Sequence, residues 1–142
     1  MSNQHSSSVL RILDANLNRL REALRVIEEH FRFISTHEQF AAELKLLRHR
    51  CADIEQAIGR NRLLQSRDTD TDPFAGEMRC EEMGRETTGD VLAANSKRAQ
   101  EAARVIEEYA KADYPQAAQR AKSMRFSLYK FEKNLTENLS DG

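Results

Sequence analysis

The sequence predicts an all-α protein, a four-helix bundle built from two copies of a helical hairpin that a long loop joins. Three observations predict this fold. One fourteen-residue helical signature occurs twice, as NLNRLREALRVIEE at 16–29 and as NSKRAQEAARVIEE at 95–108. Apolar residues recur at the three- and four-residue spacing of helix faces in four segments. The composition, with two prolines, five glycines, no tryptophan and 32% charged residues, is typical of a helix-rich protein.

The first helix is expected to begin near Ser8, with Ser7 or Ser8 as its N-cap. The pattern breaks at Ser35 and Thr36. Residues on the apolar stripe of this helix recur at about 100° per residue. They are Leu13, Leu17, Leu20, Leu24, Ile27 and Phe31.

The second helix is expected from Glu38 to Ile58, where Gly59 ends it. Its apolar face comprises Phe40, Leu44, Leu47, Cys51, Ile54 and Ile58. The stretch from Arg60 to Gly89 has no sustained periodicity, which indicates a long loop, with a short helical turn near Glu77–Met83.

The third helix, from about Asp90 to Lys111, carries the second signature, and Pro115 opens the fourth. The inward residues of the fourth helix are Ala118, Ala121, Met124, Leu128, Phe131 and Leu135. The predicted organisation is one domain, 8–138, made of hairpin 8–59, loop 60–89 and hairpin 90–138, with flexible tails at 1–7 and 139–142.

The repeat extends into the second helix of each hairpin. Arg48 and Glu55, seven residues apart, recur as Arg125 and Glu132 at an offset of 77 residues. A duplicated hairpin would form a bundle with an approximate two-fold axis, which could bring the two signature helices side by side.

Most polar residues of the signature are retained, whereas several of its packing positions have changed size. Nine of the fourteen positions are identical at an offset of 79 residues: Asn16/Asn95, Arg19/Arg98, Glu22/Glu101, Ala23/Ala102, Arg25/Arg104, Val26/Val105, Ile27/Ile106, Glu28/Glu107 and Glu29/Glu108. The changed pairs include Leu17/Ser96, Leu20/Ala99 and Leu24/Ala103. Because surface substitutions usually change stability little, retention of the polar face indicates a function.

The polar face has two interpretations. Its residues form i,i+3 and i,i+4 pairs, each worth only about 0.2–0.5 kcal/mol on an exposed helix, and a single such string is usually a solvated face. Two copies facing each other would instead gather asparagine, arginine and glutamate in a cleft. Arginine suits phosphate and glutamate suits Mg²⁺. The residues leave a phosphate site and a buried ion-pair network both open.

Charge and motif content exclude several function classes. Lys+Arg 22 against Asp+Glu 23 gives a net charge of −1, so nucleic acid and membrane are not expected partners. The sequence contains no apolar run near 20 residues and no signal-peptide pattern, so a cytoplasmic protein is expected. Cys51 and Cys80 show no metal-ligand or disulfide spacing, and no phosphate-loop, dinucleotide or zinc-protease motif occurs.

The acidic segment that begins at Asp68 does not fit a calcium-binding loop. Pro73 stands where that loop requires glycine, and Arg79 stands where it requires glutamate. Asp68 therefore remains either a Mg²⁺ ligand or part of a solvated linker.

The chain resembles a bacterial thiamine-biosynthesis domain that occurs alone or fused ahead of thiamine-phosphate synthase. The resemblance rests on RILDANLNRLREALRVIEEHFRF, LRHR, RDT, NSKRAQEAARVIEEYAK and MRFSLYKFEK, and covers Leu10 to Leu135. It implies a monofunctional hydroxymethylpyrimidine phosphate kinase that uses Mg²⁺ and ATP. The family's loop usually reads R-D-x-x-x-D-V-G, whereas here Asp72 is followed by Pro73 and the glycine is Gly76.

The resemblance and the residue types together imply three sets of roles. Phosphate-clamping catalytic residues are Arg19, Arg98, Arg25, Arg104 and Arg67. Substrate-binding residues are Asn16, Asn95, Glu22 and Glu101. Ligands of Mg²⁺ are Glu29, Glu108 and Asp68. A phosphate acceptor is already largely ionised near pH 7, so this reaction needs no general base.

Two other functions fit the residues. One is an all-α nucleotide pyrophosphatase, which would use Glu28-Glu29 and Glu107-Glu108 to hold Mg²⁺. The other is a non-catalytic helical partner or regulatory module of thiamine-phosphate synthase. The expected partners are a small phosphorylated substrate and thiamine-phosphate synthase, and the sequence leaves a homodimer open.

Overall fold

A computed structural model describes residues 3–67 and 84–140 of the chain. These residues form five α-helices and one π-helical turn, and none of them lies in a strand. The elements are α1 (Asn3–Glu29), η1 (His30–Ile34), α2 (Glu38–Ile58), α3 (Arg60–Ser66), α5 (Thr88–Ala110) and α6 (Pro115–Ser140). The predicted all-α class is confirmed.

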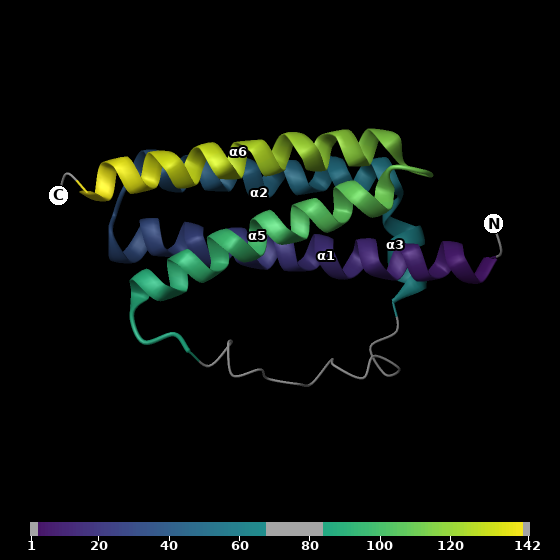
Figure 1. Ribbon diagram of the computed structural model, residues 1–142, viewed down its shortest axis with the longest axis horizontal. Coiled ribbons are helices and arrows are strands. Elements are labelled where there is room, and N and C mark those ends of the chain that lie inside the picture. Colours follow the sequence, from purple (N-terminus) through teal and green to yellow (C-terminus); the bar gives the residue numbers. More distant parts are fainter. Residues whose placement is uncertain (1–2, 68–83, 141–142) are drawn as a thin grey trace.

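The four long helices lie side by side in two layers (Figure 1). The two signature helices, α1 and α5, pack against each other and run in opposite directions. The second layer contains α2 and α6, which also contact each other. Helix α1 contacts α2 as well, α5 contacts α6, and the short α3 packs on α1.

The predicted bounds hold for α2 and the predicted start holds for α6, whereas α1 is longer than expected. It begins at Asn3, so Ser7 and Ser8 lie inside the helix and not at its N-cap. A serine cap stabilises a helix by only about 1 kcal/mol and does not prevent helix from forming before it. Helix α6 continues to Ser140, so helix also extends into both segments predicted as flexible tails.

Helix α3 lies where the sequence predicted only loop. Gly59, with a φ of 115°, ends α2, and α3 starts at the next residue. Leu63 is its buried apolar residue. Two turns are too short to show an apolar period, so periodicity could not reveal this helix. The helical turn predicted near Glu77–Met83 lies outside the described residues.

The predicted break at Ser35 and Thr36 is confirmed. The π-helical turn precedes it, and Thr36 adopts a φ of 41°, which is uncommon for a residue other than glycine. His37 then caps α2, because its Nδ1 accepts a hydrogen bond from the Phe40 backbone N–H at 3.1 Å.

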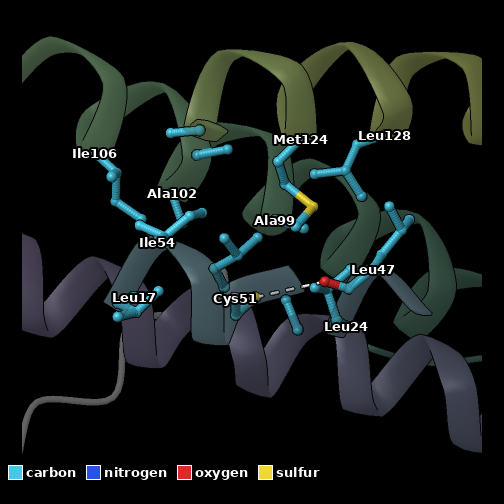
Figure 2. Packing of buried hydrophobic residues seen from close by; sticks show 14 of the residues in the cluster. Leu17, Leu24, Leu47, Cys51, Ile54, Ala99, Ala102, Ile106, Met124 and Leu128 are labelled. Atoms are coloured by element: carbon cyan, nitrogen blue, oxygen red, sulfur yellow. Dashed lines mark hydrogen bonds between the residues drawn. The ribbon is translucent and has the colours of Figure 1, made fainter. Parts of the chain in front are cut away.

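All the apolar residues predicted to face the interior are buried. Figure 2 shows Cys51 and Ile54 of α2 among leucines of α1 and small residues of α5. The Cys51 thiol donates to the Leu47 carbonyl at 3.8 Å, and burial raises its pKa to about 11. The predicted core position of Cys51 is confirmed, while Cys80 lies outside the described residues.

No helix in the described parts of the chain combines the length and the apolar character that a membrane crossing requires.

The α1–α5 contact combines large side chains on one helix with small ones on the other. Leu20 and Leu24 of α1 are buried, and so are Ala99 and Ala103 at the repeat-equivalent positions of α5. Close packing of this kind leaves little room for added methylene groups.

We therefore expect Ala99→Leu to lower the free energy of unfolding by about 1–3 kcal/mol through overpacking. Ala93→Leu, on the exposed side of the same helix, should change it by less than about 0.5 kcal/mol. Urea unfolding followed by circular dichroism measures both. Equal effects at the two positions would contradict this packing.

Candidate functional site

The polar residues that flank the core fall on two opposite sides of α1. Asp14, Arg21 and Glu28 are spaced by seven residues and therefore share one side of the helix. Their ion-pair partners come from α2 or from the end of α3. Ion pairs therefore join this side of α1 to α2 and to the end of α3.

Two buried glutamates, one on each signature helix, form corresponding contacts. Glu28 is 1% exposed, and Arg48 Nε of α2 donates to its Oε2 at 3.1 Å. Glu107 is 4% exposed, and Arg125 Nε of α6 donates to its Oε2 at 2.9 Å. These two ion pairs, called here the buried staples, each tie a signature helix to the helix that follows it.

The buried staples were missing from the predicted site residues. Repetition of Arg48 as Arg125 at an offset of 77 residues was the sequence signal for them. The spacing in the sequence pairs these arginines with Glu55 and Glu132. In the structure Glu55 instead contacts Arg21 at 2.7 Å, and Glu132 contacts Gln100 at 2.7 Å.

The predicted clamp residues Arg25 and Arg104 contact glutamates of their own helices. Arg25 Nε lies 2.8 Å from Glu29, and Arg104 Nη2 lies 2.9 Å from Glu108. Each arginine also approaches the buried glutamate of its helix, at 3.8 and 3.7 Å. Both arginines therefore screen the buried staples from one side.

The predicted Mg²⁺ ligands Glu29 and Glu108 are not brought together. Each lies near the C-terminal end of its helix, and the helices run in opposite directions, so the two carboxylates lie at opposite ends of the α1–α5 pair (Figure 1). Glu108 also contacts Lys111 at 2.9 Å, and this hydrogen bond lowers its pKa. The third predicted ligand, Asp68, lies outside the described residues.

Arg67 forms a two-pronged ion pair with Asp14 across 53 residues of sequence. Its Nε and Nη2 donate to the two carboxylate oxygens at 2.8 and 2.9 Å, and these hydrogen bonds raise the pKa of Arg67. The repeat-equivalent of Asp14 is Ala93, so α5 cannot form this contact.

The opposite side of α1 carries Asn16, Arg19, Ala23 and Val26, and the equivalent side of α5 carries Asn95, Arg98, Ala102 and Val105. We call these two rows the seam stripes. The α1 row faces away from α2, and Asn16 is nonetheless only 6% exposed. Since α5 is the long helix packed on α1 besides α2, this row borders the α1–α5 seam.

The asparagines of the seam stripes bond to their own helices. Asn16 Nδ2 donates to the Ile12 carbonyl at 2.9 Å, and Asn95 Nδ2 donates to the Val91 carbonyl at 2.8 Å. The Oδ1 of Asn16 accepts a long hydrogen bond, of 3.5 Å, from Nη1 of Arg19. The first asparagine thus contacts the arginine one turn further along.

Three charged groups at the seam have no structural use. Glu22 and Glu101 lie beside the seam stripes, and Arg19, Arg98 and both glutamates are exposed. No hydrogen bond or ion pair joins Glu22, Glu101 or Arg98 to any other residue in the described ranges. These groups recur at the offset of 79 residues, and no contact within the described residues accounts for them.

The described residues contain no preformed cluster of metal ligands. Within 3–67 and 84–140, no three His, Cys, Asp or Glu side chains come together as metal ligands would. Glu22 and Glu101 are the retained carboxylates without a cation beside them. Mg²⁺ often uses only one or two carboxylates together with substrate phosphates.

Two hollows lined by described residues lie away from the predicted site. One, of about 290 Å³, is lined by Arg50, Asp53, Arg120, Ser123 and Met124. The other, of about 450 Å³, is lined by Phe31, Arg32, Phe33, Thr36, Glu38 and Ala41. The arginines of the first hollow have no repeat counterpart, since Ser127 and Glu43 occupy the equivalent positions.

A family model described as the ThiD2 family matches residues 11–134. The chain belongs to the ThiD2 family. The match includes both seam stripes and both buried staples. No solved structure matched the chain.

Curated relatives of this family member carry the name thiamine-phosphate synthase. That of Thermosynechococcus vestitus is 44% identical over 131 residues, which cover 90% of this chain and 35% of the relative. That of Gloeobacter violaceus is also 44% identical over 131 residues, covering 90% and 36%. The protein of Rhodopirellula baltica is 40% identical over 129 residues, covering 91% and 34%. The chain thus spans about a third of the length of these relatives.

The division into structural and unused charges can be tested with two glutamates on α1. Glu28→Ala leaves Arg48 without its buried partner and should lower the free energy of unfolding by about 1–3 kcal/mol. Glu22→Ala removes an exposed carboxylate without a partner and should change it by less than about 0.5 kcal/mol. Urea denaturation measures both. A larger loss for Glu22→Ala would show that the seam charges hold the fold.

Proposed function

We propose that this chain transfers the γ-phosphoryl group of Mg-ATP to hydroxymethylpyrimidine phosphate and forms the diphosphate. An oxygen of the acceptor phosphate would form a bond to the γ-phosphorus, while the bond from that phosphorus to the β–γ bridging oxygen breaks and ADP leaves. The observation that carries the proposal is the set of Arg98, Glu22 and Glu101 at the seam, which contact no other described residue, together with Arg19, which contacts Asn16 of its own helix. Family membership and the relatives' names support a role in thiamine biosynthesis.

The chemistry of this transfer matches the residue types at the seam. The acceptor phosphate is already largely ionised near pH 7, because its second pKa is about 6. The difficulty is therefore to bring one anion against another, and arginine and Mg²⁺ solve it by neutralising charge. A seam rich in arginine and glutamate meets this requirement without a catalytic histidine.

In this proposal Arg19 and Arg98 bind the phosphates, since they are exposed and lie on the seam stripes. Asn16 orients Arg19, because its Oδ1 faces that guanidinium and its amide is bonded to the helix. Arg25, Arg104 and Arg67 are also proposed to contact phosphate. They are less suited to it than Arg19 and Arg98, because each already forms an ion pair with a carboxylate.

Glu22 and Glu101 are the residues best suited to hold Mg²⁺ in the described parts of the chain, because their carboxylates have no cation beside them. The ion would neutralise charge on the phosphates that it joins. Glu29 and Glu108 could serve only by giving up Arg25 and Arg104.

We also propose that the α1–α2 and α5–α6 pairs are copies of one hairpin. The support is the correspondence of their contacts at offsets of 79 and 77 residues. The buried staples correspond, and the contact of Arg21 with Glu55 corresponds to that of Gln100 with Glu132. A doubled seam suits a reaction with two phosphorylated substrates, one for each copy.

A second candidate function is a non-catalytic partner of thiamine-phosphate synthase. It is favoured by the finding that the relatives carry this segment within longer proteins of that name. Such a partner would not bind nucleotide. The pyrophosphatase alternative is less favoured, because Glu28 and Glu107 are committed to the buried staples.

The kinase proposal is tested by ADP release from Mg-ATP, with hydroxymethylpyrimidine phosphate, hydroxymethylpyrimidine or no acceptor. We expect turnover only with the phosphorylated acceptor. Arg19→Ala and Arg98→Ala should each reduce kcat/KM by roughly 10²- to 10³-fold, because each removes a charge that faces the transferring group. Arg50→Ala, an exposed arginine of α2, is the matched control and should retain activity.

Both seam arginines are exposed, so neither substitution should unfold the chain. The Tm of each variant, measured by thermal denaturation, shows whether a loss of activity is due to unfolding. Full activity of folded Arg19→Ala and Arg98→Ala variants would contradict the assignment of these arginines to the site. No turnover in the unaltered chain, with no shift of its Tm by Mg-ATP, would favour the partner function.

A further inference from the structure

Each seam stripe continues by one more residue, and in both copies that residue has a planar ring. His30 follows Val26 by four positions, and Tyr109 follows Val105 by four. Both continue the three- and four-residue spacing of the seam side, so they share it. They are separated by the same 79 residues as the signature, although the residue type has changed.

Neither ring is needed by the core. Tyr109 is 49% exposed, whereas a large aromatic side chain normally gains stability from burial. His30 is partly exposed, with its Nε2 2.9 Å from Ser35 Oγ and its ring edge-on to Phe31 at 5.0 Å. Burial lowers the pKa of His30 and so favours its uncharged ring.

The antiparallel packing of α1 and α5 separates the rings. His30 follows the C-terminal end of α1, and Tyr109 precedes the last residue of α5, so they lie at opposite ends of the seam (Figure 1). Arg19 and Arg98 lie nearer the middles of the two helices, between the rings. The order along the seam is therefore ring, arginines, ring.

This order matches the shape of the two substrates in the proposed function, on which the inference rests. ATP and hydroxymethylpyrimidine phosphate each carry a planar heteroaromatic ring at one end and phosphate at the other. Because the transfer brings the phosphates together, the two rings must point away from each other. A single extended site must then offer a ring contact at each end.

We propose that Tyr109 stacks on the adenine of ATP and that His30 stacks on the pyrimidine of the acceptor. The more exposed phenol ring offers the larger free face, which suits the larger purine. The imidazole, held by Ser35, offers a smaller and fixed face. Stacking of a base on an aromatic side chain is worth about 1–3 kcal/mol, or roughly 5- to 150-fold in affinity.

The test measures KM for each substrate in Tyr109→Ala and in His30→Gln, which removes the ring but keeps a polar group for Ser35. Tyr109→Ala should raise KM for ATP about 5- to 150-fold and leave that of the acceptor unchanged. His30→Gln should do the reverse. Tyr109→Phe keeps the ring and should behave like the unaltered chain.

Phe126→Ala is the matched control, because Phe126 is an aromatic residue of α6 that is 54% exposed and lies off the seam. Its loss should move neither KM. The proposal is overturned if both seam variants keep both KM values, if both raise KM for the same substrate, or if Phe126→Ala has an equal effect. Thermal denaturation of every variant confirms that it is folded.

Direct binding separates this inference from the proposed function. If the unaltered chain transfers no phosphoryl group, calorimetric titration with Mg-ATP decides. Weaker binding by Tyr109→Ala than by the unaltered chain would support the ring contact while the kinase proposal fails. Equal binding, or no binding by the unaltered chain, would overturn the ring contact as well.

Discussion

The fold depends on two buried glutamate side chains, each of which requires an arginine partner. Glu28 and Glu107 lie in the interior, where an unpaired carboxylate would be strongly unfavourable, so each needs its arginine from the following helix. Arg48 and Arg125 thereby fix the register of α2 on α1 and of α6 on α5. With the fold secured on that side and by the apolar core, the seam side of both helices is left to carry charges that serve no structural purpose.

Much of the fold was predictable from particular residues. Gly59 and Pro115 mark helix ends that the structure keeps, and the inward apolar residues follow directly from their spacing. Helix α3 was not predictable, because its seven residues are too few to show a period. The repeat identified which polar positions are retained, but it could not separate Glu28 from Glu22. That distinction depends on which flank of α1 meets α2 and which meets α5, and packing alone decides it.

On our proposal that one hairpin is duplicated, the separation of roles explains why most polar residues of the signature recur while several packing residues differ. Leucine in one copy and alanine in the other remain compatible with a filled interior as long as facing volumes compensate. The retained polar residues have no such freedom. On one side a buried glutamate needs its arginine, and on the other, in our account, arginine, glutamate and two rings meet two substrates whose phosphates must touch. In this account His30 and Tyr109, which correspond at the offset of 79 residues, differ in type because each contacts a different substrate ring.

The most direct test follows the arginine Nε–Hε signals in an NMR titration with a non-hydrolysable Mg-ATP analogue and hydroxymethylpyrimidine phosphate. The account predicts that the signals of Arg19 and Arg98 shift on binding. Those of Arg48 and Arg125, held in the buried staples, should stay in place. Shifts confined to Arg50 and Arg120, which line the hollow between α2 and α6, would contradict a site at the seam.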